Sequence, residues 1–171
     1  MSDLWIIGDP HFYHKNIISY ENRPFSSVEE MNKVLIDNWN SRISNHEKAI
    51  ILGDFCFGAN KHGAEIAKQL NGYKILIMGN HDTMSPRAYL EMGFREVYRY
   101  PIIYDGFWML SHEPLYINQN MPYANIFAHV HGNPAYADVS KQSFCASAER
   151  KALNYYPIKL SDIKKLMEEV E

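Results

Sequence analysis

Three short apolar runs in the first half of the chain each end at a glycine that is followed by a polar side chain. The runs cover residues 4–7, 49–52 and 74–78, in which Lys74 is the one polar residue, and they end at Gly8-Asp9, Gly53-Asp54 and Gly79-Asn80. Continuous runs of four or five apolar residues bounded by turn signals are typical of strands that are buried on both faces. Because helical patterns separate the runs, the sequence predicts a parallel sheet in this half.

Capping signals and apolar spacing locate the helices. Ser27 and Glu30 have the spacing of a capping box, and apolar residues at helical spacing follow them as far as Ile43. This stretch predicts a helix with one face in the core. Further helices are expected over 63–70, from Ser85-Pro86 onward, and over 161–170 with Ser161 as the cap.

The second half of the chain has shorter extended segments. Asp105-Gly106 is a hairpin signal between residues 97–104 and 107–111. The turn residues between these apolar segments indicate an arrangement different from the strand–helix alternation of the first half. Further extended segments are expected at 125–128, ending at His129, and at 143–146 and 154–158.

Composition narrows the classes of function. The length of 171 residues suits one domain covering 1–171. The formal net charge is −3 with scattered Lys and Arg, which argues against a protein built to coat nucleic acid. Neither a membrane-spanning run nor a signal-like segment is found, so no membrane partner is expected. Cys56 and Cys145 form no C-x-x-C pair, which favours a reduced, cytoplasmic setting.

Residue types that bind metals follow five of the expected strands. Ligands gather at the carboxyl ends of strands in open α/β sheets, so these side chains are expected to converge. Imidazoles, carboxylates and an amide oxygen without a thiolate suit Mn, Fe, Zn, Ni or Co rather than a structural zinc. Two metals about 3.5–4 Å apart, bridged by one carboxylate, can clamp a phosphate and activate a water. The candidate ligands are Asp9, His11, Asp54, Asn80, His112, His129 and His131.

The ordered series Asp-x-His, Gly-Asp, Gly-Asn-His-Asp, His and His-x-His resembles the calcineurin-like metallophosphoesterase superfamily. The motifs run from Asp9 to His131, and their order makes the match specific. The stretch from Asp9 to Ile18, followed by Arg23-Pro24-Phe25, is similar to a small bacterial and phage branch of predicted phosphoesterases. The resemblance implies an α/β sandwich of two mixed β-sheets flanked by helices. One departure is Ala128, where the family usually has glycine.

The resemblance also implies roles for single residues. Asp54 would bridge two divalent metal ions, with Mn expected first and Fe, Zn, Ni or Co as alternatives. His81 would contact the phosphate and assist the leaving group, and Asp82 would orient His81. The alternative for His81 is a structural histidine satisfied by Asp82. The first metal would be held by Asp9, His11 and His131, and the second by Asn80, His112 and His129.

Three residues close to the first motif are open to two interpretations. His14, Asn16 and Arg23 are candidate substrate contacts, and a guanidinium suits bidentate phosphate binding. Equally, Asn16 could cap a short helix and Arg23 could form a surface salt bridge. His46 and His62 are interpreted as surface residues, and Cys56 as a packing residue rather than a nucleophile.

Three functions follow from these patterns. The leading hypothesis is a metal-dependent phosphoric ester hydrolase that cleaves a phosphodiester or phosphomonoester of a small molecule with a metal-bridging hydroxide. A nuclease acting on nucleic-acid ends is an alternative, but it needs a basic track beside the metals and the sequence shows none clearly. A catalytically silent scaffold of the same fold is the third hypothesis, and the complete set of ligand types together with His81 argues against it.

Overall fold

The computed structural model describes residues 3–170. Strands and helices alternate through the first half, and most of the short strands lie in the second. Their order along the chain is β1 (Leu4–Ile7), α1 (Lys15–Tyr20), α2 (Val28–Arg42), β2 (Lys48–Leu52), α3 (Ala59–Gln69), β3 (Tyr73–Ile77), α4 (Pro86–Met92), β4 (Glu96–Tyr98), β5 (Ile102–Tyr104), β6 (Trp108–Leu110), β7 (Ala124–Phe127), β8 (Ser143–Cys145), β9 (Ile158–Lys159) and α5 (Leu160–Glu168).

The larger sheet has the strand order β4-β3-β2-β1-β9. Strands β1 to β4 are parallel, which confirms the sequence-based prediction, and β9 runs antiparallel to β1. Ile6, Ile50 and Ile75 form one row across the three central strands, and all three are buried. Burial on both faces explains why these strands read as unbroken apolar runs.

The smaller sheet has the order β5-β6-β7-β8 and is also mixed. Strands β5 and β6 form the expected hairpin, with positive φ at both Asp105 (51°) and Gly106 (68°). The first arm of that hairpin is shorter than expected, because β4 belongs to the larger sheet and only β5 to the smaller one. Pro101 lies between them and has no N–H for a strand ladder, which suits the change of sheet.

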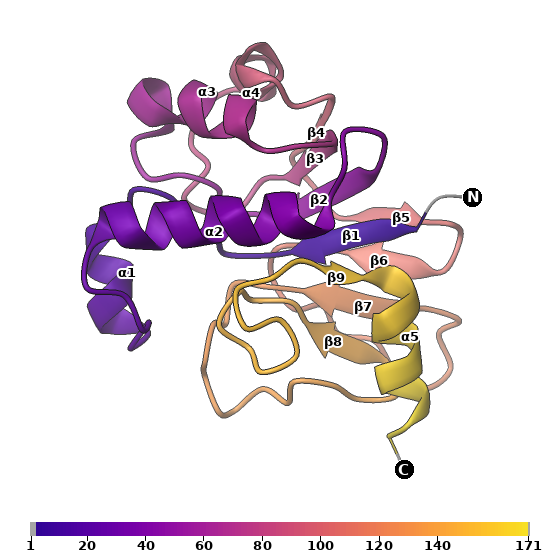
Figure 1. The fold of residues 1–171 in the computed structure, drawn as a ribbon. Coiled ribbons are helices and arrows are strands. Elements are labelled where there is room, and N and C mark those ends of the chain that lie inside the picture. Colours follow the sequence, from indigo (N-terminus) through magenta and orange to yellow (C-terminus); the bar gives the residue numbers. More distant parts are fainter. Residues whose placement is uncertain (1–2, 171) are drawn as a thin grey trace.

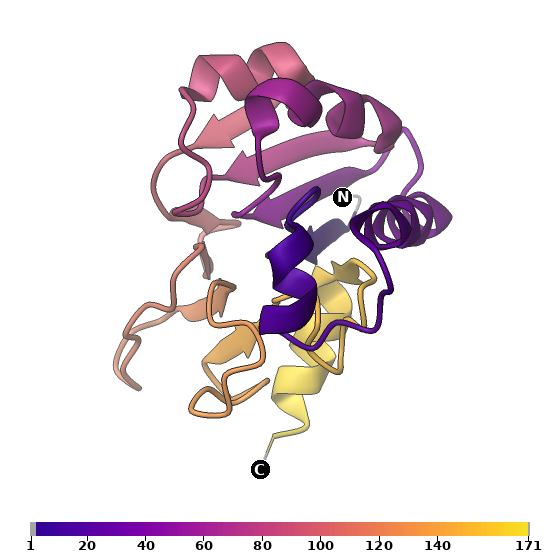
Figure 2. The same cartoon turned by 90° about the vertical axis from the view of Figure 1, so that its left-hand side faces the viewer.

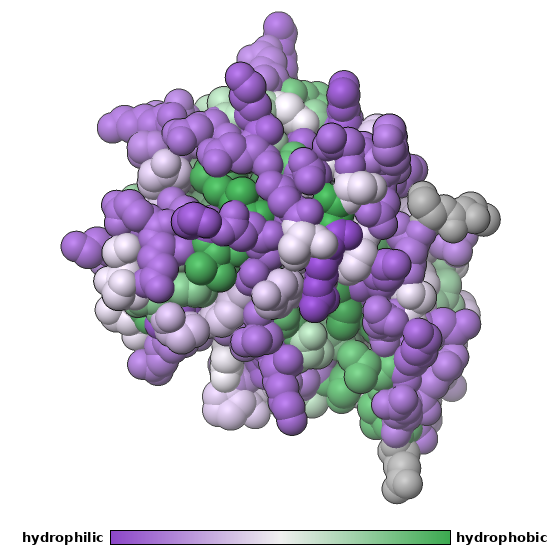
Figure 3. Space-filling model, in the orientation of Figure 1, coloured by the Kyte–Doolittle hydropathy of each residue, from purple (hydrophilic) through white to green (hydrophobic). Residues whose placement is uncertain are grey.

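The two sheets share one core, and helices cover the outside (Figure 1). Buried residues of both sheets, such as Leu52 and Ile126, belong to the same apolar cluster. Helix α5 contacts β1, β8 and β9. The face seen in Figure 3 is mostly hydrophilic, with hydrophobic residues in the seam between α2 and α3 and beside α5. The expected fold class, an α/β sandwich of two mixed sheets flanked by helices, is confirmed.

Helix α2 begins as predicted, because Ser27 Oγ accepts the backbone N–H of Glu30 at 3.1 Å. Three other expectations were inaccurate. Helix α3 begins earlier, at Ala59. Residues 154–156 are turns rather than an extended segment, since Asn154 and Tyr155 have positive φ, and β9 starts only at Ile158. Ser161 does not cap α5; its hydroxyl contacts the Asp3 carboxylate instead.

The carboxyl ends of β1, β2, β3, β6 and β7 meet at the side of the molecule where α1 lies (Figure 2). A parallel bridge between Gly8 and Ser147 connects the ends of the two sheets at this edge. The backbone N–H of Gly8 donates to the Ala146 carbonyl at 2.7 Å, and the backbone N–H of Ala148 donates to the Gly8 carbonyl at 3.0 Å. These bonds fix the position at which the chain leaves β1 for the candidate site.

Candidate metal centre

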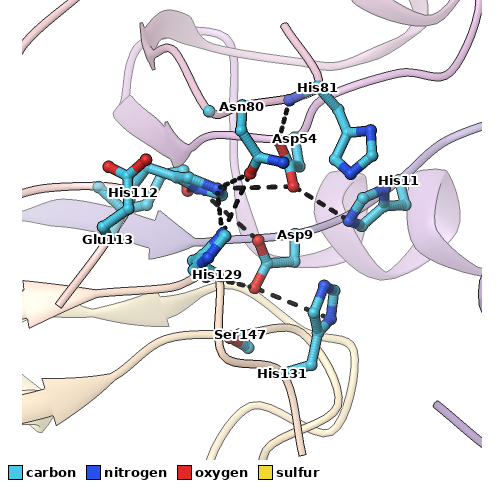
Figure 4. Close-up of polar contacts among 12 residues, drawn as sticks. Asp9, His11, Asp54, Asn80, His81, His112, Glu113, His129, His131 and Ser147 are labelled. Carbon is cyan, nitrogen blue, oxygen red and sulfur yellow. Dashed lines mark hydrogen bonds and ion pairs between the residues drawn. The ribbon is translucent and has the colours of Figure 1, made fainter. Parts of the chain in front are cut away.

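Seven side chains that the sequence singled out come together at this edge (Figure 4). Each follows the end of a strand, and together they come from both sheets. They fall into two groups that share one residue, Asp54. The first group is Asp9, His11, Asp54 and His131, and the second is Asp54, His112 and His129, with Asn80 beside it.

The first group lies around the carboxylates of Asp9 and Asp54. Nε2 of His11 is 3.3 Å from Oδ2 of Asp54, and Nδ1 of His131 is 3.9 Å from Oδ2 of Asp9. Asp9, His11 and Asp54 are buried, and the His131 side chain is 15% exposed. One oxygen or nitrogen from each member lies within 4.8 Å of the others, which is close enough for a shared cation.

The second group is arranged around Nε2 of His112. This nitrogen lies 3.0 Å from Oδ1 of Asn80, 3.1 Å from Nδ1 of His129 and 3.5 Å from Oδ2 of Asp54. The other ring nitrogen of His112, Nδ1, lies 2.8 Å from the Leu52 carbonyl, to which it donates as an N–H. Nε2 therefore carries the lone pair and points at the other acceptors.

Buried polar atoms in the centre have no hydrogen-bond partner among the described residues. Oδ1 of Asp9 and Nε2 of His11 are of this kind. A buried acceptor without a partner destabilises a fold by about 1–3 kcal/mol, so such atoms need an explanation. Divalent cations would satisfy them, together with the acceptors that face Nε2 of His112. The residues present therefore fit two metal ions of the kind bound by nitrogen and oxygen.

The pKa values reflect the crowding of ionisable groups. Burial raises the pKa of Asp9 to about 6 and lowers the pKa of His11 to about 4. Burial opposes ionisation of Asp54 as well, but its contacts with His11 and His112 prevail and lower its pKa to about 2. Burial likewise opposes protonation of His131, yet the hydrogen bond with Glu149 raises its pKa to about 9. Burial thus favours the neutral forms of Asp9 and His11, whereas contacts with neighbouring groups favour the charged forms of Asp54 and His131.

Five of the seven candidates have a left-handed backbone, although none is a glycine. Non-glycine residues in this region cost about 1–3 kcal/mol each, and such strain gathers at functional sites. Hydrogen bonds hold the strained turns: His11 N–H donates to the Asp54 carbonyl at 3.0 Å, and His129 N–H to Oδ2 of Asp9 at 2.9 Å. The values of φ are 52° for Asp9, 50° for His11, 54° for Asp54, 67° for His129 and 49° for His131.

His81 and Asp82 have separate surroundings. The His81 imidazole is exposed, and its ring centroid lies 5.4 Å from that of His11. Asp82 is buried, and its carboxylate accepts three backbone N–H groups: Asp54 at 2.8 Å, Phe55 at 3.1 Å and Gly79 at 2.9 Å. Among the described contacts no hydrogen bond joins Asp82 to the His81 ring, so the expectation that Asp82 orients His81 is not met. Asp82 instead ties the turn after β2 to the turn after β3.

The three tentative substrate contacts have different positions. Nδ1 of His14 lies 3.2 Å from Nδ1 of His11, and its ring stacks on Phe57, so His14 borders the centre. Asn16 is exposed within α1, and the N-cap of that helix is His14 rather than Asn16. Arg23 forms neither a surface salt bridge nor an open phosphate contact. Its side chain is buried, and its guanidinium donates to the backbone carbonyls of Asp9 and Pro10 and pairs with Glu149.

Sequence reasoning missed Glu149. Its carboxylate lies 2.5 Å from Nδ1 of His131 and 3.0 Å from the guanidinium of Arg23. Glu21, His131 and Glu149 form a third cluster of metal-binding residue types. No motif marks Glu149, since its relation to His131 depends on how β8 and the loop after it pack against β1. His46 is exposed as predicted, and His62 is half-buried and stacks on Tyr13.

Comparison with known proteins identifies the family from almost the whole chain. The family model described as calcineurin-like phosphoesterase matches residues 3–169. The chain belongs to this family. The recognition made from the motifs is therefore confirmed, and the family is one of phosphoric ester hydrolases that normally bind divalent metals.

Similar proteins come from an archaeon, a phage and two bacteria. "Uncharacterized protein MJ1445" of Methanocaldococcus jannaschii is 37% identical over 98% of this chain and 93% of its own length. "Gene 66 protein" of Mycobacterium phage L5 is 34% identical over 50% of this chain and 42% of its own. Among solved structures, the protein of unknown function AQ665 from Aquifex aeolicus is 27% identical with a TM-score of 0.71, covering 98% of this chain and 100% of its own. Pseudomonas putida nuclease MPE has a TM-score of 0.51 at 20% identity, covering 75% and 61%, and shows the fold alone.

Ala128 departs from the glycine usual in this family, and the structure shows what accommodates its methyl group. Ala128 is fully buried, and a Cβ built on Gly8 would lie 2.3 Å from the Cβ of Ala128. Only one of the two positions therefore has room for a methyl group. Gly8 leaves the space that Ala128 fills.

A double-mutant experiment tests this exchange. Gly8→Ala is expected to destabilise the fold by about 1–3 kcal/mol, the usual cost of overpacking a core. Adding Ala128→Gly is expected to recover part of that loss but not all, because the Ala146 carbonyl and Leu52 Cβ lie only 3.3 and 3.4 Å from the new methyl. Urea unfolding followed by circular dichroism measures both changes. Strictly additive effects of the two substitutions would contradict the argument.

Proposed function

We propose that the chain is a dinuclear metal-dependent phosphoesterase. The observation that carries this proposal is the shared position of Asp54, whose Oδ2 lies 3.3 Å from His11 in one group and 3.5 Å from His112 in the other. A carboxylate between two ligand sets is the arrangement that places two cations close together. Asp9, His11 and His131 would hold one ion, Asn80, His112 and His129 the other, and Asp54 both.

Two divalent ions at these positions would supply positive charge for a phosphate and acidity for a water. The protein supplies the rest. Asp9 and Asp54 concentrate negative charge in a buried place, and the Leu52 carbonyl fixes the tautomer of His112. The N–H of His81 donates to Oδ1 of Asp54 at 2.9 Å, so the turn that carries the His81 side chain is tied to the shared ligand.

We assign His81 the delivery of a proton to the leaving oxygen. Its ring is exposed at the open side of the centre and belongs to no metal-ligand group among the described residues. His81→Ala is expected to lower kcat by about 100-fold, the effect of losing one general acid. Bound metal and KM should change little, which kinetics and metal analysis of the same sample can check. An unchanged kcat would show that His81 has no part in the mechanism, and it would not affect the proposed metal centre.

Charge beside the centre favours a small ester with a single negative charge. A hollow of about 620 Å³ adjoins His129 and His131, and its other lining includes Tyr20, Glu21 and Tyr136. None of the described residues that line it is Lys or Arg. Arg150, which lies close by, is occupied by the Asp138 carboxylate and two carbonyls. A phosphodiester monoanion suits this pocket better than a phosphomonoester dianion or a nucleic-acid strand.

A substrate panel tests the proposed function. Protein purified without chelator, and reloaded with Mn, Ni, Co or Zn, would be assayed on bis-p-nitrophenyl phosphate, p-nitrophenyl phosphate and duplex DNA with free ends. We expect the diester to be the best substrate, with Mn²⁺ the most effective metal. A preference for the DNA ends would favour the nuclease, and no turnover with any metal would favour the silent scaffold.

Location and domain organisation are further proposals. Among the described residues no helix combines the length and apolarity needed to cross a membrane. Cys56 and Cys145 are free and buried, which suits the reduced cytoplasm. Burial raises the pKa of the Cys56 thiol to about 12, so it is a poor nucleophile.

A single core shared by the two sheets supports one domain over residues 1–171.

A further inference from the structure

Glu149 contacts His131, which belongs to the first of the two metal groups. Its Oε1 lies 2.5 Å from Nδ1 of His131, and its side chain is 8% exposed. A carboxylate that accepts an Nδ1–H holds the imidazole in one tautomer and one orientation. In the neutral imidazole the proton is then on Nδ1, and the lone pair of Nε2 is free for a metal.

Arg23 holds the second oxygen of the same carboxylate. Its Nη2 donates to Oε2 of Glu149 at 3.0 Å and to the Asp9 carbonyl at 2.7 Å, and its Nη1 donates to the Pro10 carbonyl at 2.9 Å. The Arg23 side chain is completely buried. This one guanidinium therefore connects the backbone at Asp9 with the carboxylate that faces His131.

The other metal group is supported differently. Nδ1 of His112 faces a backbone carbonyl, that of Leu52, at 2.8 Å. A carbonyl fixes the tautomer without adding charge, whereas a carboxylate also makes the imidazole a stronger ligand. The two groups are thus held by different partners, and a change at Glu149 should reach only one of them.

We propose that Glu149, held in place by Arg23, is a positioning residue for the metal site formed by Asp9, His11, Asp54 and His131. Its carboxylate sets the tautomer of His131 and thereby the metal affinity of this site, while the site of Asn80, His112 and His129 is independent of it. This inference rests on the dinuclear function proposed above.

Glu149→Gln tests the proposal with almost no change of shape. Arg23 can only donate, so the oxygen of the new amide would turn to Arg23 and its NH₂ would face His131. Nδ1 of His131 must then accept, which moves the ring proton to Nε2, the atom needed for the metal. Titration of Mn²⁺ into chelator-treated protein should show two sites in the wild type. In the variant, the affinity of one site should fall about 10–100-fold and that of the other should stay the same.

Glu21→Gln is the matched control. Glu21 belongs to the same cluster as His131 but makes no hydrogen bond to its ring among the described contacts; its Oε2 accepts the Gly132 N–H at 3.3 Å. This variant removes a nearby charge and leaves the tautomer alone, so the Mn²⁺ affinity of the first site should fall much less than in Glu149→Gln. Thermal unfolding by circular dichroism would verify that both variants are folded.

A second measurement reads the tautomer directly. In histidine-¹⁵N-labelled protein loaded with Zn²⁺, NMR should show His131 protonated at Nδ1 in the wild type and not in Glu149→Gln. Unchanged affinities in Glu149→Gln, an equal loss in Glu21→Gln, or three bound ions in the wild type would each overturn the inference. A wild-type protein that binds no divalent metal would overturn the proposed function itself, so the two failures are distinguishable.

Discussion

Asp54→Asn is expected to abolish the binding of both metal ions and to lower kcat/KM by about 1,000-fold or more. The reason is that Oδ2 of Asp54 lies within 3.5 Å of a histidine in each group. Metal ions contribute several kcal/mol to transition-state stabilisation in such enzymes, and each 1.4 kcal/mol is about a factor of ten in rate. Asparagine keeps an oxygen that can accept the His81 N–H, so the turn after β3 should stay in place. The variant loses only the negative charge and the second oxygen ligand of Asp54.

Metal analysis and kinetics on the same preparations check this expectation. Asp37→Asn is a suitable control, because the Asp37 side chain is 59% exposed on α2, pairs with Lys33 and belongs to none of the metal groups. It should bind two ions and retain full activity. An Asp54→Asn protein that still binds two ions with wild-type affinity would show that the two groups do not share this carboxylate.

Asp82→Ala is expected to have the largest effect on stability, with a loss of at least about 3 kcal/mol. Its buried carboxylate accepts the N–H groups of Asp54, Phe55 and Gly79, and each buried donor left without an acceptor costs about 1–3 kcal/mol. In a chain of this length that loss corresponds to a fall in Tm of roughly 10 °C. Thermal unfolding of the metal-free protein measures it without interference from bound ions.

Two further variants test whether the loss of stability comes from the hydrogen bonds of Asp82 with the two turns or from removing a charge. Asp82→Asn keeps one acceptor oxygen and the shape of the side chain, so its destabilisation should be smaller than that of Asp82→Ala. Asp37→Ala, at an exposed site, should change stability by less than about 0.5 kcal/mol. If Asp82→Ala lost less than about 1 kcal/mol, the carboxylate would not hold the two turns together.

The strands and the positions of the candidate ligands could be predicted from the sequence. Apolar runs such as 49–52 are buried on both faces of a parallel sheet, so their composition alone identifies them. The carboxyl ends of parallel strands meet at one edge, which is why residues as far apart as Asp9 and His131 could be expected to converge. The family resemblance supplied the two-sheet arrangement, which no local pattern shows.

The sequence could not predict which partners the side chains around the metal groups would bind in the folded protein. The motif suggested that Asp82 serves its neighbour His81, whereas its carboxylate binds three backbone N–H groups of two turns. Arg23 has the chemistry of a phosphate ligand, but the fold buries its guanidinium against Glu149. Spacing in the sequence says nothing about either choice.

By itself the sequence determined which residues could bind metal and at which edge of the sheet they would lie, because strand polarity and residue type are local properties. The tertiary structure decided how those residues are held. The hydrogen bond of Arg23 with Glu149, and the close approach of Gly8 to Ala128, join segments more than a hundred residues apart in the sequence. Only the packing of the two sheets brings such pairs within a few ångströms, and hydrogen bonding and steric exclusion act only at that range.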